Sequence, residues 1–497
     1  MSQTTGAQVV GAQSSASSGP GTGRLRRDAL GVAAITFFVV SAAAPLTAVA
    51  GGFPIAMLLG NGAGVPAATL IVMAILLVFS VGYTAMARHI SNAGSFYAFT
   101  ARGLGGVAGG AAAYIAVLAY NTMQMGLYGL FGAVAAGTFA TFTGTDSPWY
   151  VWSLGAWAIV AVFGYRQIDL SAKVLGILVV LEYMVVLVLD AAIVGNGGAG
   201  HNSVYSFTPT AFFSGSWVIG MLLCFASFMG FEATTIYGEE ARDPSRTIPR
   251  ATYLSVIVIG LFYAFTSWCM VNGTGPDKLM DVLGGLKDPT TFIYTLSDQF
   301  VGSGLSKVMS LLFISSVFAA LLAFHNAAAR YFYVLGREGL CPASLGRTHD
   351  EHQSPHLGSV LQSVFALAVV LIFVLTGQDP VLALFTWLTN LATLSVITLM
   401  ALVSFSVVVF FNREKRLAPS PLQAVVAPIG AGLVLAFVAV KVVENFQLLT
   451  GAQSPLLAYG LTSLVLVAGA LGAGAASMLK NNDSARYAQL GAHQNGQ

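Results

Sequence analysis

The sequence predicts an all-α membrane protein, and three observations support this fold class. Only 8% of the 497 residues are charged, against about 25% in an ordinary soluble domain. Hydrophobic residues make up 56% of the chain, and apolar runs of about 20 residues, the length that crosses a bilayer, recur along it. These runs are continuous, whereas the strands of a membrane β-barrel would alternate apolar and polar residues over about ten positions.

Twelve membrane-spanning helices are expected, separated by short segments rich in charged residues, glycine or proline. They cover residues 30–58, 65–87, 106–140, 149–165, 172–195, 212–237, 252–273, 304–335, 357–376, 380–411, 422–444 and 455–478. Residues 1–23 are rich in Ser, Gly, Thr, Gln and Ala and lack the short apolar core of a secretory signal. They are therefore expected to form a disordered tail.

Basic residues are distributed unequally between the two sides of the predicted helices. With a cytoplasmic N-terminus, eighteen of the 22 Lys and Arg residues fall in cytoplasmic segments, whereas Lys278, Lys287 and Lys307 fall on the opposite side. The positive-inside rule then predicts a multi-pass protein of the cytoplasmic (inner) membrane with both termini in the cytoplasm. The basic residues form no continuous patch, so the expected surroundings are the lipid bilayer and nucleic acid is not an expected partner. The sequence does not define an oligomeric state.

Two of the predicted spans contain features that interrupt a helix. Pro45 lies near the middle of the first span and removes a backbone donor there, so the helix is expected to unwind between Ser41 and Thr47. The sixth span carries Gly230 two residues before Glu232, and a charge inside a membrane helix costs about 2.5–3.5 kcal/mol. Interruptions five helices apart are expected when two five-helix halves of inverted topology build one site from two discontinuous helices.

Three sequence blocks resemble the amino acid/polyamine/organocation (APC) family of transporters. The first is FMGFE at 228–232, followed by EEARDPSRTIPRA at 239–251. The second is HNAAAR at 325–330 with GREGLCP at 336–342, and the third is NAGSFYAF at 92–99. Their order and spacing over residues 30–480 make coincidence improbable.

This resemblance implies the leucine-transporter fold, in which two inverted repeats of five helices are followed by two further helices. Residues 24–197 would form the first repeat, 198–416 the second, 417–480 the two additional helices and 481–497 a cytoplasmic tail. The implied function is a secondary active permease that imports an amino acid or related amine by alternating access. An exchanger of amino acids or polyamines with the same fold is the alternative.

The resemblance also indicates a solute site at the two interruptions. In the first span, backbone N–H groups over Ser41, Ala42, Ala43, Ala44 and Pro45 would meet a carboxylate, although the family usually has alternating glycines there. Carbonyls near Ser41, Ala42, Phe228 and Met229 would accept from an ammonium group. Ser227, Gly230 and Phe231 complete the sixth-span part, where Phe228 and Phe231 are either an aromatic gate or packing residues.

Polar side chains in two other spans are further candidates for the lining. Asn121 and Gln124 in the third span are three residues apart and share a helix face, although polar residues in membrane helices often only join neighbouring helices. Trp387, Asn390 and Thr393 form a weaker candidate lining in the tenth span.

The coupling of transport to an ion gradient would require a titratable group within the membrane. The candidates are Glu182 and Asp190 in the fifth span, Glu232 in the sixth and Glu444 near the end of the eleventh. Some family members carry a lysine at the position aligned with Glu182. A carboxylate withdrawn from water favours its neutral form, so Glu182 is the leading proton-coupling residue, with a structural carboxylate as the alternative and Glu232 as the second candidate.

Several other functions are disfavoured by what the sequence contains. A Gly-rich Lys-Ser/Thr nucleotide motif is missing, so an ATP-driven pump within this chain is excluded and no cofactor is expected beyond a proton gradient. The three cysteines have no paired spacing, which disfavours a metal site. The sequence lacks the repeated polar pore face expected of a solute channel. It also lacks the cluster of His, Asp or metal ligands within the spans that an intramembrane enzyme would show. A neutral apolar amino acid would contact Phe228, Met229 and Met125, whereas a cationic solute would use Glu232 or Glu182.

Overall fold

The computed structural model describes residues 31–90, 94–166, 172–199, 201–239, 241–349, 354–451 and 455–492. The predicted tail at residues 1–23 and the last five residues lie outside this part of the chain. Within it the chain is helical, with no β-strand. The first half contains α1 (Val32–Ala42), η1 (Thr47–Gly52), α2 (Phe53–Ala56), η2 (Met57–Asn61), η3 (Gly62–Gly64), α3 (Val65–Ala87), α4 (Phe96–Leu104), α5 (Gly106–Thr143), α6 (Trp149–Arg166) and α7 (Ala172–Gly195).

The second half begins with short helices and continues with long ones. Its elements are η4 (Tyr205–Phe207), α8 (Pro209–Phe212), α9 (Trp217–Ser227), η5 (Phe231–Glu239), α10 (Pro244–Thr274), α11 (Leu279–Gly285), η6 (Pro289–Thr291), α12 (Phe292–Phe300), α13 (Ser303–Glu338), η7 (Ala343–Gly346), α14 (His356–Leu375), η8 (Pro380–Phe385), α15 (Thr386–Arg413), η9 (Leu422–Val426), α16 (Ala427–Asn445), α17 (Gln447–Thr450), α18 (Leu456–Asn482) and α19 (Ser484–Ala488).

Ten helical segments of the described residues are long and apolar enough to cross a membrane. One of them, Thr47–Ala87, has 41 residues, about twice the length that a bilayer requires, and the backbone leaves helical geometry at Gly60 and Gly62 within it. The 18-residue helix α6 and the short apolar helix α1 are not among the ten. The expected membrane protein is therefore confirmed as a class, whereas the number of twelve spans stays a prediction.

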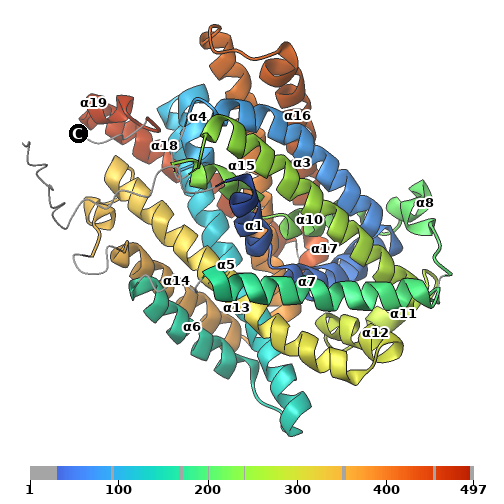
Figure 1. Cartoon of the computed structure of the whole chain (residues 1–497). Coiled ribbons are helices and arrows are strands. Elements are labelled where there is room, and N and C mark those ends of the chain that lie inside the picture. Colours follow the sequence, from blue (N-terminus) through green and yellow to red (C-terminus); the bar gives the residue numbers. More distant parts are fainter. Residues whose placement is uncertain are drawn as a thin grey trace, which may run out of the picture.

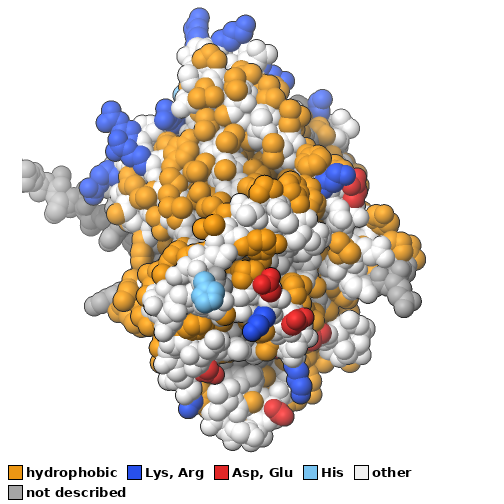
Figure 2. Space-filling model, turned by 90° about the vertical axis from the view of Figure 1, so that its right-hand side faces the viewer, with side chains coloured by type: hydrophobic (Ala, Val, Ile, Leu, Met, Phe, Trp, Pro, Cys, Tyr) orange, Lys and Arg blue, Asp and Glu red, His pale blue; other side chains and the backbone are white. Residues whose placement is uncertain are grey.

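The outer surface of the bundle is apolar, as a lipid environment requires. Leu375, Leu456 and Leu466 are 83%, 78% and 77% exposed, respectively. Figure 2 shows hydrophobic side chains over a broad part of one face, with Lys and Arg side chains projecting from its upper and left-hand edges. An exposed apolar surface of this extent would aggregate in water.

Helix α5 passes through the middle of the bundle (Figure 1) and packs against α13, α15 and α18. Its small residues permit this close packing. A Cβ atom at Gly126 would lie 2.8 Å from the Thr389 side chain of α15, and one at Gly110 would lie 2.4 Å from the Gly472 carbonyl of α18. The central position of α5 brings Met123 and Leu127 to a cavity in the middle of the bundle.

Both predicted interruptions are present in the structure. Helix α1 ends at Ala42, and Ala44 has a φ of 46°, which is uncommon for a residue with a side chain. The chain becomes helical again from Pro45, whose missing N–H is tolerated at the start of a helix. Helix α9 ends at Ser227, and Gly230 has a φ of 109° before η5 begins.

The C-terminal segment after α18 folds back onto the helical bundle, at the end where α4 lies (Figure 1). Leu490 is buried, and the N–H of Gly491 donates to Glu338 Oε2 over 3.2 Å. Tyr97 of α4 donates its hydroxyl to the same oxygen. Glu338, at the end of α13, therefore joins α4 to the C-terminal segment.

Candidate solute-binding site

The two interruptions face one cavity in the middle of the bundle. The free volume there is about 60 Å³, which is room for a few water molecules. The lining comes from η1 and the residues before it, α5, α9 and the turn after it, α13, η8 and α15. It consists of Ala43, Ala44, Thr47, Ala48, Gly52, Met123, Leu127, Leu223, Ala226, Ser227, Met229, Ala320, Phe324, Phe385 and Thr389.

The cavity lining is apolar with a few hydroxyl groups. Thr47, Ser227 and Thr389 contribute hydroxyls, and the other lining residues are glycine, alanine, leucine, methionine or phenylalanine. Charged recognition of a solute at this lining would therefore fall to backbone groups at the interruptions. The side chains suit a solute that has an apolar body.

Glu182 of α7 is bound to the start of the second half of the first span. The N–H of Leu46 donates to Glu182 Oε2 over 3.3 Å, and the hydroxyl of Ser316 on α13 donates to the same oxygen over 2.8 Å. Ser316 Oγ in turn accepts from the N–H of Thr47 over 3.3 Å. Glu182 is 2% exposed, and the N-terminus of a helix favours an anion in this position.

Glu232 is fully buried and closes the turn at the second interruption. Its Oε1 accepts from the Tyr120 hydroxyl of α5 over 2.7 Å, and its Oε2 accepts from the N–H of Gly230 over 2.9 Å. The hydroxyl of Tyr83 donates to the Glu232 carbonyl over 3.1 Å. Glu232 thus holds the non-helical turn in shape, and its side chain is not part of the cavity lining.

The structure places the predicted residues of the first span in different positions. Ala43 and Ala44 line the cavity, whereas Pro45 is buried outside the lining. The hydroxyl of Ser41 donates to the Phe37 carbonyl of its own helix over 2.7 Å. The side chain of Ala42 lies outside the described part of the chain.

In the sixth span, Ser227 and Met229 line the cavity. Phe228 and Phe231 lie behind it, where their rings pack edge-on against Tyr263 and Phe79 at centroid distances of 6.1 and 6.2 Å. Together with Met229, they border a second, smaller space of about 10 Å³. Met229 contributes to both spaces.

The third-span candidates point away from the cavity. Asn121 donates to the Val117 carbonyl one turn earlier over 2.7 Å, and Gln124 donates to the Tyr128 hydroxyl over 2.8 Å. Gln124 also accepts from Gln362 of α14. The lining from this helix is instead Met123 and Leu127, which are four residues apart on one face.

The weaker candidates in the tenth span also bond elsewhere. Trp387 donates to the Leu449 carbonyl over 3.2 Å, and Asn390 donates to the Thr386 carbonyl over 2.6 Å. Thr393 donates to the Thr389 carbonyl over 2.7 Å. The face of this span that reaches the cavity carries Phe385 and Thr389.

Residues of α13 were missed by reasoning from the sequence. Ser316 contacts Glu182, and Ala320 and Phe324 line the cavity. The three residues are spaced four apart and therefore share one helix face. That spacing was the available signal, but alanine and phenylalanine at such spacing are ordinary packing residues in an apolar helix.

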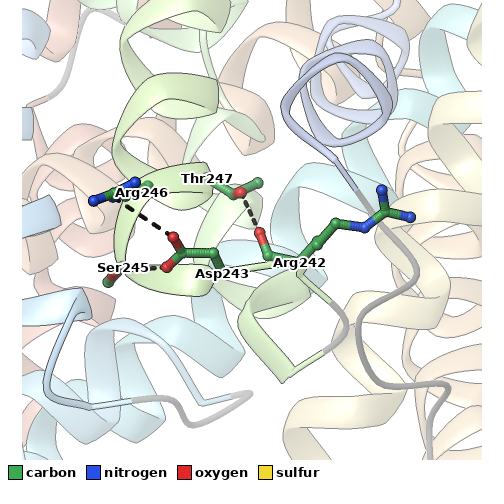
Figure 3. A network of polar contacts seen from close by, with 5 residues as sticks. All are labelled: Arg242, Asp243, Ser245, Arg246 and Thr247. Carbon is green, nitrogen blue, oxygen red and sulfur yellow. Dashed lines mark hydrogen bonds and ion pairs between the residues drawn. The ribbon is translucent and has the colours of Figure 1, made fainter.

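The charged stretch that follows the second interruption forms a local network (Figure 3). Asp243, with a φ of 50°, accepts from the Ser245 hydroxyl over 2.7 Å and lies 3.7 Å from Arg246 Nε. Thr247 donates its hydroxyl to the Arg242 carbonyl. The pair of Asp243 and Arg246 is exposed and therefore worth about 0–1 kcal/mol, and it lies at the start of α10.

Comparison with known proteins identifies the family of this chain. A family model of amino acid permeases matches residues 44–473. The chain belongs to the amino acid permease family. This APC-family permease is 26% identical over 362 residues to the low-affinity putrescine importer PlaP of Escherichia coli K12, covering 71% of the chain and 75% of the relative.

The names of other relatives give different substrates. The permease is 24% identical over 383 residues to the branched-chain amino acid permease BcaP of Bacillus subtilis, with 74% of this chain and 78% of the relative covered. It is 25% identical over 326 residues to the lysine-specific permease of Saccharomyces cerevisiae, with 60% and 52% covered. The family and these relatives indicate a membrane transporter of amino acids or amines.

Proposed function

We propose that this permease imports an amino acid or related amine across the inner membrane by proton-coupled alternating access. The observation that carries the proposal is the shared cavity. Two helix interruptions far apart in sequence, near Ala44 and near Gly230, face one space that has an apolar lining. Discontinuous helices at such a site supply both backbone donors and backbone acceptors to a solute.

The proposed architecture is the leucine-transporter fold with twelve spans. The two interruptions would lie in the first helices of two inverted five-helix repeats, and α16 and α18 would be the two additional helices. Both termini would face the cytoplasm, supported by the excess of Lys and Arg in the segments assigned to that side.

Glu182 is the proposed coupling residue, and its contacts support this assignment. It joins three elements, because it lies on α7 and accepts from Leu46 at the first interruption and from Ser316 on α13. A proton on Glu182 would weaken both contacts, because hydrogen bonds to an ionised carboxylate are about twice as strong as neutral ones. Glu232 is the second candidate, although its contacts with Tyr120 and Gly230 lie within a single turn and its neighbouring helix.

Uptake into proteoliposomes tests the proposal. Radiolabelled amino acids and amines are offered with a proton gradient or a sodium gradient imposed separately, and the recovered solute is checked for chemical change. Saturable accumulation of unchanged solute with the proton gradient is expected. Accumulation that needs sodium contradicts proton coupling, unsaturable flux indicates a channel, and uptake only against internal solute indicates an exchanger.

Two variants test which residue couples transport to the proton gradient. Glu182→Gln retains the size and an acceptor oxygen but removes the charge, so solute exchange is expected to persist while proton-driven accumulation is lost. Asp190→Asn is the matched control, because Asp190 lies on the same helix, is 1% exposed, and bonds Thr266 over 2.7 Å away from the interruption. Proton-driven accumulation that survives in Glu182→Gln moves the coupling role to Glu232.

A further inference from the structure

The backbone donors at the first interruption already have acceptors. Ala43 and Ala44 donate back to Val39 and Ser41, each over 3.1 Å, and Pro45 has no N–H. The next two N–H groups, those of Leu46 and Thr47, point to Glu182 Oε2 and Ser316 Oγ, each over 3.3 Å. Ala48 donates to the Ala44 carbonyl over 3.2 Å, which is the first regular bond of the resumed helix.

The donors at the second interruption are engaged as well. Phe228 and Met229 donate to Phe225 and Ala226 over 3.1 and 3.2 Å. Gly230 donates to Glu232 Oε2 over 2.9 Å, and Phe231 donates to the Phe228 carbonyl over 3.2 Å. The two interruptions therefore offer a solute carboxylate no donor that is not already bonded within these stretches.

Acceptors are arranged differently from donors at this site. Helices α1 and α9 both end at the cavity. Several of their last carbonyls accept an N–H group of the following turn, but a carbonyl oxygen has two lone pairs and carries partial negative charge at the C-terminus of a helix, so it can accept a second donor. An ammonium group can use those carbonyls with the cavity as it stands. A carboxylate needs the N-terminus of the resumed helix, where Glu182 and Ser316 accept from the first two N–H groups.

We propose that Glu182 stands in for the carboxylate of the solute, so that an amine binds while Glu182 is ionised but an α-amino acid binds only once a proton has neutralised Glu182. The proton moves onto the Glu182 carboxylate, which weakens its hydrogen bonds from the Leu46 N–H and the Ser316 hydroxyl, and the Thr47 N–H is freed when Ser316 turns. The solute carboxylate then takes the N–H of Thr47, a residue that lines the cavity. The inference rests on the proposed function, because it concerns the same cavity and the same glutamate.

Among the described residues, no basic side chain lies beside Glu182, so a proton is the charge that can neutralise its carboxylate. The titratable groups beside it are the phenols of Tyr183 and Tyr263, and Tyr263 donates to the Ala43 carbonyl over 3.0 Å. Helix α7 packs against α1, α10, α12 and α13. The charged residues of these elements are Lys173 and Asp190 on α7, Arg246 and Arg250 on α10, Asp298 on α12, and Lys307, Arg330, Arg337 and Glu338 on α13.

On α7 and α13 these charges lie at least two turns from Glu182 and Ser316. Lys307 is nine residues from Ser316, which corresponds to about 13 Å along a helix that rises 1.5 Å per residue. Asp190 is eight residues from Glu182, or about 12 Å. Neither is positioned to pair with Glu182 directly.

The test uses pairs of ligands that differ only by a carboxylate. Leucine is compared with isoamylamine, and ornithine with putrescine, by calorimetric binding to the purified full-length chain between pH 6 and 8, where all four ligands keep their charges. The dissociation constant of the amino acid is expected to rise about tenfold per pH unit once Glu182 is ionised, because one proton is bound with the solute. The amine of the same pair should show no such slope.

Two variants test whether Glu182 causes this pH dependence of the dissociation constant. In Glu182→Gln the amino acid should bind without pH dependence, whereas in Asp190→Asn the slope should persist. Equal slopes for both members of a pair, or a slope that survives in Glu182→Gln, overturn the inference while leaving proton-driven transport intact. Conversely, carboxylate-dependent slopes without proton-driven uptake would uphold the inference and refute the proposed coupling. If neither member of either pair binds at any pH, the inference fails, and the uptake panel decides the proposed function separately.

Discussion

Substitution of Gly52 tests whether the apolar cavity is the space that holds the solute. Gly52 lines the cavity, and an added Cβ would lie 3.6 Å from Ser227 Oγ, an ordinary contact distance. Its backbone, with φ of −84° and ψ of −51°, is helical and accepts any side chain. Gly52→Ala should therefore fold as well as the parent, since alanine in a helix is favoured over glycine by about 0.5–1 kcal/mol.

The expected effect on the solute follows from the volume that the new methyl group takes. One displaced CH₂ contact is worth about 0.8 kcal/mol, and overfilling a packed space costs about 1–3 kcal/mol. The KM for a solute that fills the cavity should therefore rise by roughly 5–150-fold, because each 1.36 kcal/mol is a factor of ten. The effect should be smaller for a solute that is shorter by one methylene.

The assay compares uptake kinetics for a series of solutes of increasing length in proteoliposomes. Gly137→Ala on α5 is the matched control, because a Cβ atom there meets nothing within 4 Å. Gly230 is a poorer target for substitution, since its φ of 109° strains any residue with a side chain and mixes folding with binding. An unchanged KM across the series in Gly52→Ala, with normal protein levels, would refute the placement of the solute in this cavity.

Two further predictions concern the contacts that hold the site and the C-terminal segment. Tyr120→Phe removes the hydroxyl bond to the buried carboxylate of Glu232 and should lower the free energy of unfolding by about 1–3 kcal/mol, measured by thermal unfolding in detergent; an unchanged melting temperature contradicts the importance of that bond. Gly491→Val should release the C-terminal segment and speed its proteolysis, because the backbone there has a φ of 67° and a Cβ atom would lie 3.1 Å from α4. Gly474→Val, in open space on α18, should leave the cleavage rate unchanged, and equal rates in all three proteins would count against docking.

The sequence alone determined the class of the protein and the positions of the two interruptions. Continuous apolar runs in a chain with few charges allow only membrane helices, because backbone groups in lipid must be bonded within the segment. Pro45 and Gly230 each imposed a local backbone geometry, and the structure breaks the helices beside them. The family resemblance also rested on local blocks of sequence, and the match over residues 44–473 confirms it.

The residues that face the cavity were decided by the tertiary structure. Asn121 and Gln124 were predicted to line the site because polar side chains in an apolar helix are candidates for solute contact. Instead they donate hydrogen bonds to Val117 and Tyr128, while Met123 lines the cavity. Rotation of a helix about its own axis is set by its packing against several neighbours. In a helix that is apolar on all sides, no hydrophobic stripe records that rotation.

The environment of Glu182 likewise required the folded chain. Its carboxylate was visible in the sequence as an unusual residue in a membrane helix, but its acceptor role at Leu46 and Ser316 was not. Those partners are 136 and 134 residues away in the chain, and they meet only because α7, α13 and the resumed first helix pack together. Local sequence fixes backbone geometry and the burial of a segment, whereas contacts between distant helices depend on packing that no single segment encodes.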